Sequence, residues 1–160
     1  MSRAKQVPEE AKPIIRFYSA SAEHGELSNF APYAITLKGK RWPTSEHYFQ
    51  AQKFLTARDQ EEIRTASTPM LAARRGRERK RKLRRAWERA KIGVMREAVE
   101  AKFRQHDELR VLLLDTGNAT LIEHTENDDF WGDGGDGTGR NELGRILMAV
   151  RERLRDEHGH

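Results

Sequence analysis

The glycine-rich stretch between Phe130 and Asn141 constrains the fold of this chain more than any other segment. Five of the twelve glycines lie within eight positions, from Gly132 to Gly139. Glycine at this density excludes a regular helix or strand and allows the backbone to come close to another group. An apolar pattern typical of a helix follows directly, with Leu143 as its first member. We therefore predict a binding loop that leads into a C-terminal helix.

The known phosphate-binding patterns fit this loop poorly. Residues 132–137 satisfy G-x-G-x-x-G, but no strand ends just before them, and Asp133 and Asp136 lie inside the loop. A P-loop would need a Gly-Lys-Ser/Thr sequence, which does not follow. A calcium loop built from Asp128 and these two aspartates would lack the EF-hand spacing and its terminal glutamate. We expect a loop whose amides face a polar ligand, and no metal.

Three residues of this region are candidates for contact with the ligand. Trp131 can cover an apolar or aromatic surface, and Asp129 offers a carboxylate. Asn141 lies near the start of the last predicted helix, where free N–H groups and a side-chain amide can hold a phosphate or sugar oxygen. The alternative is a glycine-rich turn in which Asn141 acts as a cap, and the sequence leaves both interpretations open.

A helix over residues 45–58 is predicted, with Thr44 as its N-cap. Along this helix Glu46, Gln50 and Lys53 follow the i, i+4, i+7 spacing of one stripe. Glu46 and Lys53 would then lie about 10 Å apart along the axis and would flank a ligand rather than bond each other. An ordinary polar face is the alternative interpretation.

Positive charge is concentrated in one segment, which runs from Arg74 to Lys91. It holds 11 Lys or Arg residues and 2 acids, and because the whole chain carries +5, the other residues sum to −4. Such a run can attract the phosphates of a nucleic acid, although a solvated helix face is the alternative. Trp87 is its one aromatic residue, and serves either as a core anchor or as a platform on which a base stacks. The sequence from Met70 into this run predicts a helix, with Gly76 as an interruption.

The rest of the chain alternates short strand patterns with helical ones. Runs of β-branched and aromatic residues predict strands over residues 14–19, 33–42 (a hairpin) and 119–124. Amphipathic spacing predicts helices that begin near residues 91, 107 and 143. We therefore expect an α+β fold, a single compact and mostly helical domain around a small β-sheet. Residues 1–13 are expected to form a mobile leader, and residues 14–157 the domain.

Composition excludes several classes of protein. The chain has 160 residues and no cysteine, which excludes disulfides, thiolate metal sites and a cysteine nucleophile. It has no apolar run of about 18 residues and no apolar signal segment at its start. We expect a soluble, cytoplasmic protein with no membrane partner.

Four motifs, taken together and in this order, resemble the NADAR superfamily. They are residues 27–32 (LSNFAP), 46–54 (EHYFQAQKF), 101–103 (AKF) and 131–144 (WGDGGDGTGRNELG). The resemblance implies a small α+β domain that acts on N-glycosidic bonds at ribose and needs no cofactor. Known members of the family hydrolyse ribosylamino intermediates of riboflavin biosynthesis or remove ADP-ribose from guanine bases.

The resemblance also implies which residues form the pocket. The catalytic residues that we expect are Glu46, Lys53 and Asp129. The residues expected to bind the substrate are Asn29, Gln50, Trp87, Trp131, Gly132 and Asn141. One position departs from the family pattern, because Ala86 stands where an acidic residue often precedes the tryptophan.

Cleavage of a bond between ribose C1 and a nitrogen needs stabilised positive charge at C1, a proton for the leaving nitrogen, and water. Glu46 and Asp129 are the expected carboxylate pair, and Lys53 offers a second route by attacking C1 of a ring-opened sugar to form a Schiff base. We expect an N-glycoside hydrolase with an ADP-ribosyl or phosphoribosyl substrate. The basic run from Arg74 to Lys91 favours ADP-ribosylated nucleic acid as that substrate. A non-catalytic module that binds ADP-ribose or nucleic acid is the alternative.

Overall fold

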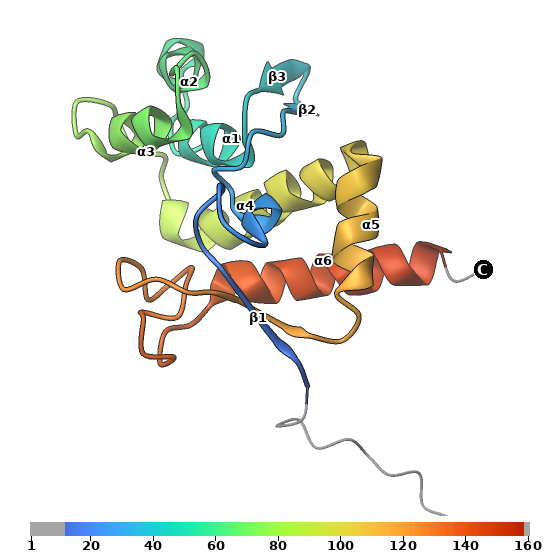
Figure 1. The fold of residues 1–160 in the computed structure, drawn as a ribbon. Coiled ribbons are helices and arrows are strands. Elements are labelled where there is room, and N and C mark those ends of the chain that lie inside the picture. The colour runs from blue at the N-terminus through green and yellow to red at the C-terminus, as the bar shows by residue number, and fades with distance from the viewer. Residues whose placement is uncertain (1–11, 159–160) are drawn as a thin grey trace, which may run out of the picture.

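Six α-helices make up about half of the part of the chain that the computed structural model describes, residues 12–158 (Figure 1). The helices are α1 (Ser45–Ala51), α2 (Ala57–Arg64), α3 (Pro69–Arg77), α4 (Trp87–Gln105), α5 (Asp107–Asp115) and α6 (Glu142–His158). The strands are β1 (Ile14–Phe17), β2 (Ile35–Leu37), β3 (Lys40–Trp42) and β4 (Thr120–Glu123), and a short 3-10 turn, η2, covers Gly25–Leu27. The predicted α+β, mostly helical domain is confirmed. The expected leader lies outside the described residues except for its last two positions.

Two separate two-stranded sheets take the place of the one small sheet that we expected. β1 and β4 pair in parallel, with Phe17 opposite Glu123. β2 and β3 form the predicted hairpin, with Ile35 opposite Trp42. The parallel pair brings the start of the domain next to the strand that leads into the glycine-rich loop, so residues that are far apart in the sequence meet there (Figure 1).

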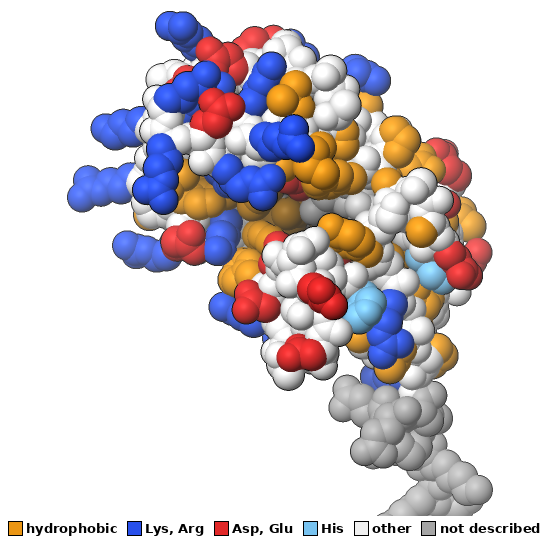
Figure 2. All heavy atoms as spheres, turned by 60° about the vertical axis from the view of Figure 1, so that its left-hand side comes forward, with side chains coloured by type: hydrophobic (Ala, Val, Ile, Leu, Met, Phe, Trp, Pro, Cys, Tyr) orange, Lys and Arg blue, Asp and Glu red, His pale blue; other side chains and the backbone are white. Residues whose placement is uncertain are grey.

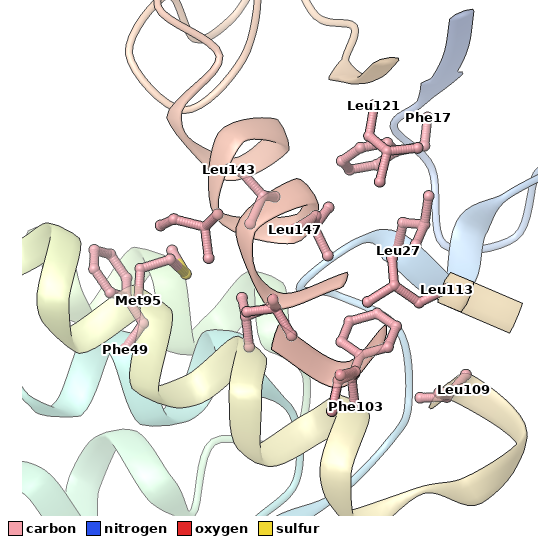
Figure 3. Packing of buried hydrophobic residues seen from close by; sticks show 14 of the residues in the cluster. Phe17, Leu27, Phe49, Met95, Phe103, Leu109, Leu113, Leu121, Leu143 and Leu147 are labelled. Atoms are coloured by element: carbon pink, nitrogen blue, oxygen red, sulfur yellow. The ribbon is translucent and has the colours of Figure 1, made fainter. Parts of the chain in front are cut away.

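Two apolar clusters hold the domain together, and α1 lies between them. The larger cluster joins α4, α5, α6 and β4, and Figure 3 shows side chains such as Phe103, Leu121 and Leu147 pointing into it. The smaller cluster joins the hairpin to α1 and α2. Tyr48 of α1 belongs to the smaller cluster and Phe49 to the larger, and every residue of α1 is buried. A helix buried on all sides is held rigidly, so its polar side chains do not form the solvated face considered above.

The first helix ends earlier than predicted. Thr44 caps it as expected, because its Oγ1 accepts a hydrogen bond from the N–H of His47 at 3.1 Å. The chain leaves the helix after Ala51 because Phe54 is buried and forms a β-bridge to Leu83, a tertiary contact that the local pattern does not reveal. As a result Lys53 follows the helix instead of lying on it, and the predicted stripe ends at Gln50.

The helix predicted through the basic run is also interrupted. Residues 78–86 form a loop between α3 and α4. Arg81 anchors this loop: its guanidinium is buried and donates from Nε to Glu62 Oε2 at 2.9 Å and from Nη1 to the carbonyl oxygen of Arg75 at 2.9 Å. A charge-assisted pair of this kind outweighs helix propensity, which amounts to a few tenths of a kcal/mol per residue.

Candidate active site

A cavity of about 1000 Å³ lies between α1, the end of α3, the start of α4 and the loop after β4. Figure 2 shows a hollow with hydrophobic surface inside it and many Lys and Arg side chains on the part of the molecule beside it. The lining contains six of the nine predicted site residues, namely Asn29, Glu46, Gln50, Lys53, Trp87 and Trp131. The structure therefore brings together side chains from four separate parts of the sequence.

Glu46, in the first turn of α1, is held by a neighbour one turn later. Gln50 donates from Nε2 to Glu46 Oε1 at 2.7 Å, and the two residues are 8% and 7% exposed. Gly76 of α3 leaves the space that Gln50 occupies, because a Cβ at Gly76 would overlap Gln50 Oε1. Burial raises the pKa of Glu46, while the hydrogen bond from Gln50 and the charges of Lys53 and Arg77 lower it in part. The cavity thus contains a fixed carboxyl group with an elevated pKa.

Three cationic side chains line the same cavity: Lys53, Arg77 and Lys91. Lys53 Nζ lies 3.5 Å from the carbonyl oxygen of Gly76. Burial lowers the pKa of Lys53; the charge of Glu46 opposes this, and the charges of Arg77 and Lys91 add to it. A lysine with a lowered pKa is more often the neutral amine, which is the form that attacks a carbonyl carbon.

Glu123 and Asp128, which we did not predict as site residues, bring two further carboxyl groups to the cavity. Glu123 is the last residue of β4, and its Oε2 is buried without a hydrogen-bond partner. Burial, with added repulsion from Asp128 and Glu46, raises the pKa of Glu123 to about 7. Asp128 Oδ1 accepts hydrogen bonds from the N–H groups of Phe130 and Trp131 at 2.9 and 2.8 Å. The cavity is therefore acidic around the end of β4.

An aromatic wall faces these charged groups. The ring centroid of Phe49 lies 5.3 Å from that of Trp87 and 5.3 Å from that of Trp131. Trp87 is 5% exposed, belongs to the larger core cluster and also lines the cavity, so the core role considered from the sequence is confirmed. Phe130 packs against Trp131 and lies under Lys91, whose Nζ is 3.9 Å from the ring centroid. The rings are tilted or perpendicular to one another, so the wall offers single aromatic faces and edges beside polar groups, which suits a heterocyclic base.

Asn29 connects the cavity to the start of α1. Its Oδ1 accepts a hydrogen bond from Ser45 Oγ at 2.9 Å, and its carbonyl oxygen accepts one from the N–H of Glu46 at 3.3 Å. Its Nδ2 lies 3.2 Å from the sulfur of Met95. Because a thioether is a weak acceptor, exchanging this contact for a hydrogen bond to a polar ligand would cost the amide nitrogen little free energy.

The glycine-rich loop closes on itself around Asp133, and this contradicts our expectation that its amides face a ligand. Asp133 Oδ1 accepts hydrogen bonds from the N–H groups of Thr125 and Gly135 at 3.1 and 2.9 Å, and its Oδ2 lies 2.8 Å from His124 Nδ1. Its carbonyl oxygen accepts from the N–H of Gly139. The glycines therefore allow a compact loop that presents Trp131 to the cavity.

The other three predicted site residues do not line the cavity. Asn141 has a structural role: its Nδ2 donates to the carbonyl oxygen of Leu121 at 2.9 Å, and its Oδ1 accepts from the N–H of Glu123 at 3.0 Å. Gly132 is buried where a Cβ would lie 2.8 Å from the carbonyl oxygen of Glu123, so it is needed for packing. Asp129 is exposed, and Asp128 takes the place at the cavity that we expected it to hold.

The strand pattern contained a signal for Glu123. Leu121 is fully buried, and a residue two positions further along a strand lies on the same face. Glu123 is half-buried, and a carboxyl group on the face of a strand that carries a core leucine is unusual and marks a candidate functional residue. Within residues 12–158, no group of three or more His, Cys, Asp or Glu side chains is placed to hold a metal ion, and no helix is long and apolar enough to cross a membrane.

Fold and cavity define a small α+β domain with buried carboxyl groups opposite an aromatic wall. A NADAR domain matches residues 16–155, and the chain belongs to the NADAR family. The resemblance inferred from the four sequence motifs is thereby confirmed.

Relatives of known name agree with this assignment. The chain is 60% identical over 141 residues to N-glycosidase YbiA of Escherichia coli (strain K12), and the match covers 88% of each protein. The NMR structure of the E. coli protein YbiA superposes with a TM-score of 0.85 at 57% identity, covering 93% of this chain and 92% of that one. The chain is also 50% identical over 142 residues to riboflavin biosynthesis protein VVA0006 of Vibrio vulnificus, which covers 89% of this chain and 39% of that protein.

Proposed function

We propose that the protein hydrolyses the N-glycosidic bond of a ribosylamino intermediate of riboflavin biosynthesis that carries a phosphate. The chain is an N-glycosidase, a hydrolase that acts on N-glycosyl bonds. Relatives that it matches along most of their length carry this name. The riboflavin pathway enters through the Vibrio relative, whose name places that protein in riboflavin biosynthesis. The observation that carries the proposal is the buried Glu46, fixed by Gln50, in a cavity that also offers an aromatic wall.

The cavity supplies a surface for each part of such a substrate. The flat pyrimidine packs on the indole of Trp131, whose ring stands at 84° to that of Phe49, and the phosphate lies near Arg77 and Lys91, whose charges attract it. The ribose then lies between them, beside Glu46. The carboxylate of Glu46 stabilises the positive charge that develops at C1 as the bond to nitrogen breaks.

Lys53 supports a second route through the same cavity. In a ring-opened sugar, C1 is a carbonyl or iminium carbon that a neutral amine attacks. The lowered pKa of Lys53, caused first by its burial, favours this neutral amine. Attack would release the nitrogen base and leave a Schiff base between Lys53 and the sugar, which water then hydrolyses.

The two routes make different predictions for one reagent. If Lys53 is the nucleophile, borohydride will trap a covalent sugar adduct in the wild-type protein, and Lys53→Ala will lose both the adduct and turnover. If wild-type protein turns over substrate and Lys53→Ala stays active, hydrolysis is direct. In either case Glu46→Gln should lower kcat/KM by about 10²- to 10⁴-fold at unchanged melting temperature. Loss of fold instead of rate would contradict the catalytic role of Glu46.

ADP-ribosylated guanine in nucleic acid is the second candidate substrate, favoured by the exposed cations of the basic run. Arg79, Lys80 and Lys82 are exposed in the loop that follows α3, whose last residue, Arg77, lines the cavity. Purified protein should be incubated in parallel with a ribosylaminopyrimidine phosphate and with guanine-ADP-ribosylated DNA. Release of free sugar phosphate from the first supports our proposal, and release of ADP-ribose from the second alone contradicts it. Binding that weakens with salt, without turnover of either, would indicate a non-catalytic module.

A further inference from the structure

Glu123 is held by its backbone on both sides, yet its carboxyl group is left without a partner. Its N–H donates to Asn141 Oδ1 at 3.0 Å, and its carbonyl oxygen accepts from the N–H of Asp133 at 2.9 Å. On the other edge, β4 pairs with β1, where Phe17 is opposite Glu123. The side chain lines the cavity, and its buried Oε2 has no hydrogen-bond partner. A buried polar atom without a partner on so rigid a support is costly unless a ligand uses it.

The three carboxyl groups of the inner cavity are not equivalent. Burial raises the pKa of Glu46, but this carboxyl group also accepts a hydrogen bond from Gln50 and lies near the charges of Lys53 and Arg77, which favour its charged form. Asp128 uses Oδ1 to accept two backbone hydrogen bonds. Glu123 has no such donor, and its charged neighbours are acidic. When like charges share a site, the proton remains on the group whose anion is least stabilised. Of the three, Glu123 has a buried oxygen that accepts no hydrogen bond, and the charges that raise its pKa are all acidic, so its charged form has the least support from donors and cations.

The charged groups around Glu123 are these. Its acidic neighbours, in order of their effect, are Asp128, Glu46 and Asp133. The cations that line the cavity are Lys53, Arg77 and Lys91, and His124, which follows Glu123, is engaged with Asp133. Burial, with the repulsion from these three acids, raises the pKa of Glu123 to about 7.

We propose that Glu123 is the general acid of this site, paired with the carboxylate of Glu46 in place of the Asp129 that we expected. The protonated carboxyl of Glu123 gives its proton to the leaving nitrogen while the bond from C1 to that nitrogen breaks and its electron pair moves to nitrogen. The Glu123 carboxylate then takes a proton from the water whose oxygen bonds to C1. One water is consumed and the acid is restored. The inference rests on the proposed N-glycosidase reaction and names the proton donor within it.

The test compares kcat/KM as a function of pH for wild-type protein, Glu123→Gln and a matched control, Glu126→Gln. Glu126 is an exposed carboxylate three residues further along that does not line the cavity. With a ribosylaminopyrimidine phosphate at pH 6, Glu123→Gln should lose about 100-fold or more, because it has no proton to give. Its remaining rate should no longer fall as the pH rises through 7. Glu126→Gln should retain the wild-type rate and profile.

The wild-type profile gives an independent readout if Glu123→Gln fails to fold. Wild-type kcat/KM should fall by about tenfold per pH unit above pH 7, as the acid loses its proton. A flat wild-type profile between pH 6 and pH 9, or a Glu123→Gln variant as active as wild type, overturns this inference alone. Absence of wild-type turnover overturns the proposed function, and the role of Glu123 with it.

Discussion

Replacing Gly76 by alanine should separate activity from stability in this protein. Gly76 lies inside α3, close to its end, where alanine is normally the better residue. Here an added Cβ would overlap Gln50 Oε1 and lie 2.8 Å from Gln50 Cδ. Both contacts are with the end of a flexible side chain, and Gln50 Oε1 has no hydrogen-bond partner that resists its displacement; a third contact, 3.1 Å from Gln50 Cβ, needs only a small shift of the two helices. Gln50 is therefore expected to turn away, and the 2.7 Å hydrogen bond to Glu46 will break.

The two effects on stability nearly cancel. The change from glycine to alanine within a helix stabilises the folded state by about 1 kcal/mol. Loss of a hydrogen bond to a buried carboxyl group costs about 1 to 3 kcal/mol. We expect a net loss of stability of about 0 to 2 kcal/mol. Activity should fall much further, because Glu46 loses the neighbour that fixes its position: a loss of about 1.4 to 2.8 kcal/mol in transition-state binding corresponds to about 10- to 100-fold in kcat.

Gly93→Ala is the matched control. Gly93 also lies within a helix, α4, but nothing comes within 4 Å of a Cβ there. This variant should gain about 0.5 to 1 kcal/mol of stability and keep its rate. Urea denaturation and steady-state kinetics on the two variants provide the comparison. If Gly76→Ala matches Gly93→Ala in both measurements, the reasoning that couples α3 to Glu46 through Gln50 is refuted.

Three further substitutions test charges and polar groups elsewhere. Burial raises the pKa of Glu123 from 4.5 to about 7, so between these pH values the folded protein holds a proton that the unfolded chain has released. As the pH rises from 4.5 to 7, the free energy of unfolding of wild type should therefore fall by up to about 3 kcal/mol relative to Glu123→Gln, measured by denaturant titration. Lys102 shows the opposite dependence, because burial lowers its pKa to about 7 while its Nζ donates to the carbonyl oxygens of Glu26 and Ser28. Between pH 7 and pH 9 the free energy of unfolding of wild type should rise by about 2 to 3 kcal/mol relative to Lys102→Met. No rise would contradict the burial of its charge. Asn141→Ala removes two part-buried hydrogen bonds at a residue with φ of 53°, one of them to the backbone of Glu123, so it should cost about 3 kcal/mol by thermal melting and also lower kcat.

Features set by a few neighbouring residues were predictable from the sequence. The Thr44 cap depends on a side chain and an N–H three residues apart, and Thr68 followed by Pro69 starts α3 in the same way. The breaks in the helices were not predictable, because they result from contacts between distant residues. Phe54, just after α1, forms a β-bridge to Leu83, and Arg81 of the basic run donates a hydrogen bond to Glu62.

The candidate site shows the same division at the scale of single residues. A spacing of four on a helix was enough to bring Glu46 and Gln50 together, since a helix fixes where i and i+4 lie. No such rule decides between Asp128 and Asp129, because an irregular turn directs each side chain. The turn is set by Asp128 itself, which caps the N–H groups of Phe130 and Trp131 and so faces inward, while Asp129 faces solvent.

Glu123 lies between these cases and shows how a sequence can be searched for such sites. Its strand places it on the same face as the buried Leu121, two residues earlier, where Glu123 is half-buried and its Oε2 is fully buried. What the period cannot supply is the reason for burying a carboxyl group there. In the proposed mechanism the reason is Glu46, on a helix 77 positions earlier in the chain, because the two residues would provide one carboxylate to stabilise a cation and one acid to protonate a leaving group. The two carboxyl groups meet because both line the cavity, so the partner of such a residue has to be sought among the other residues of the same cavity.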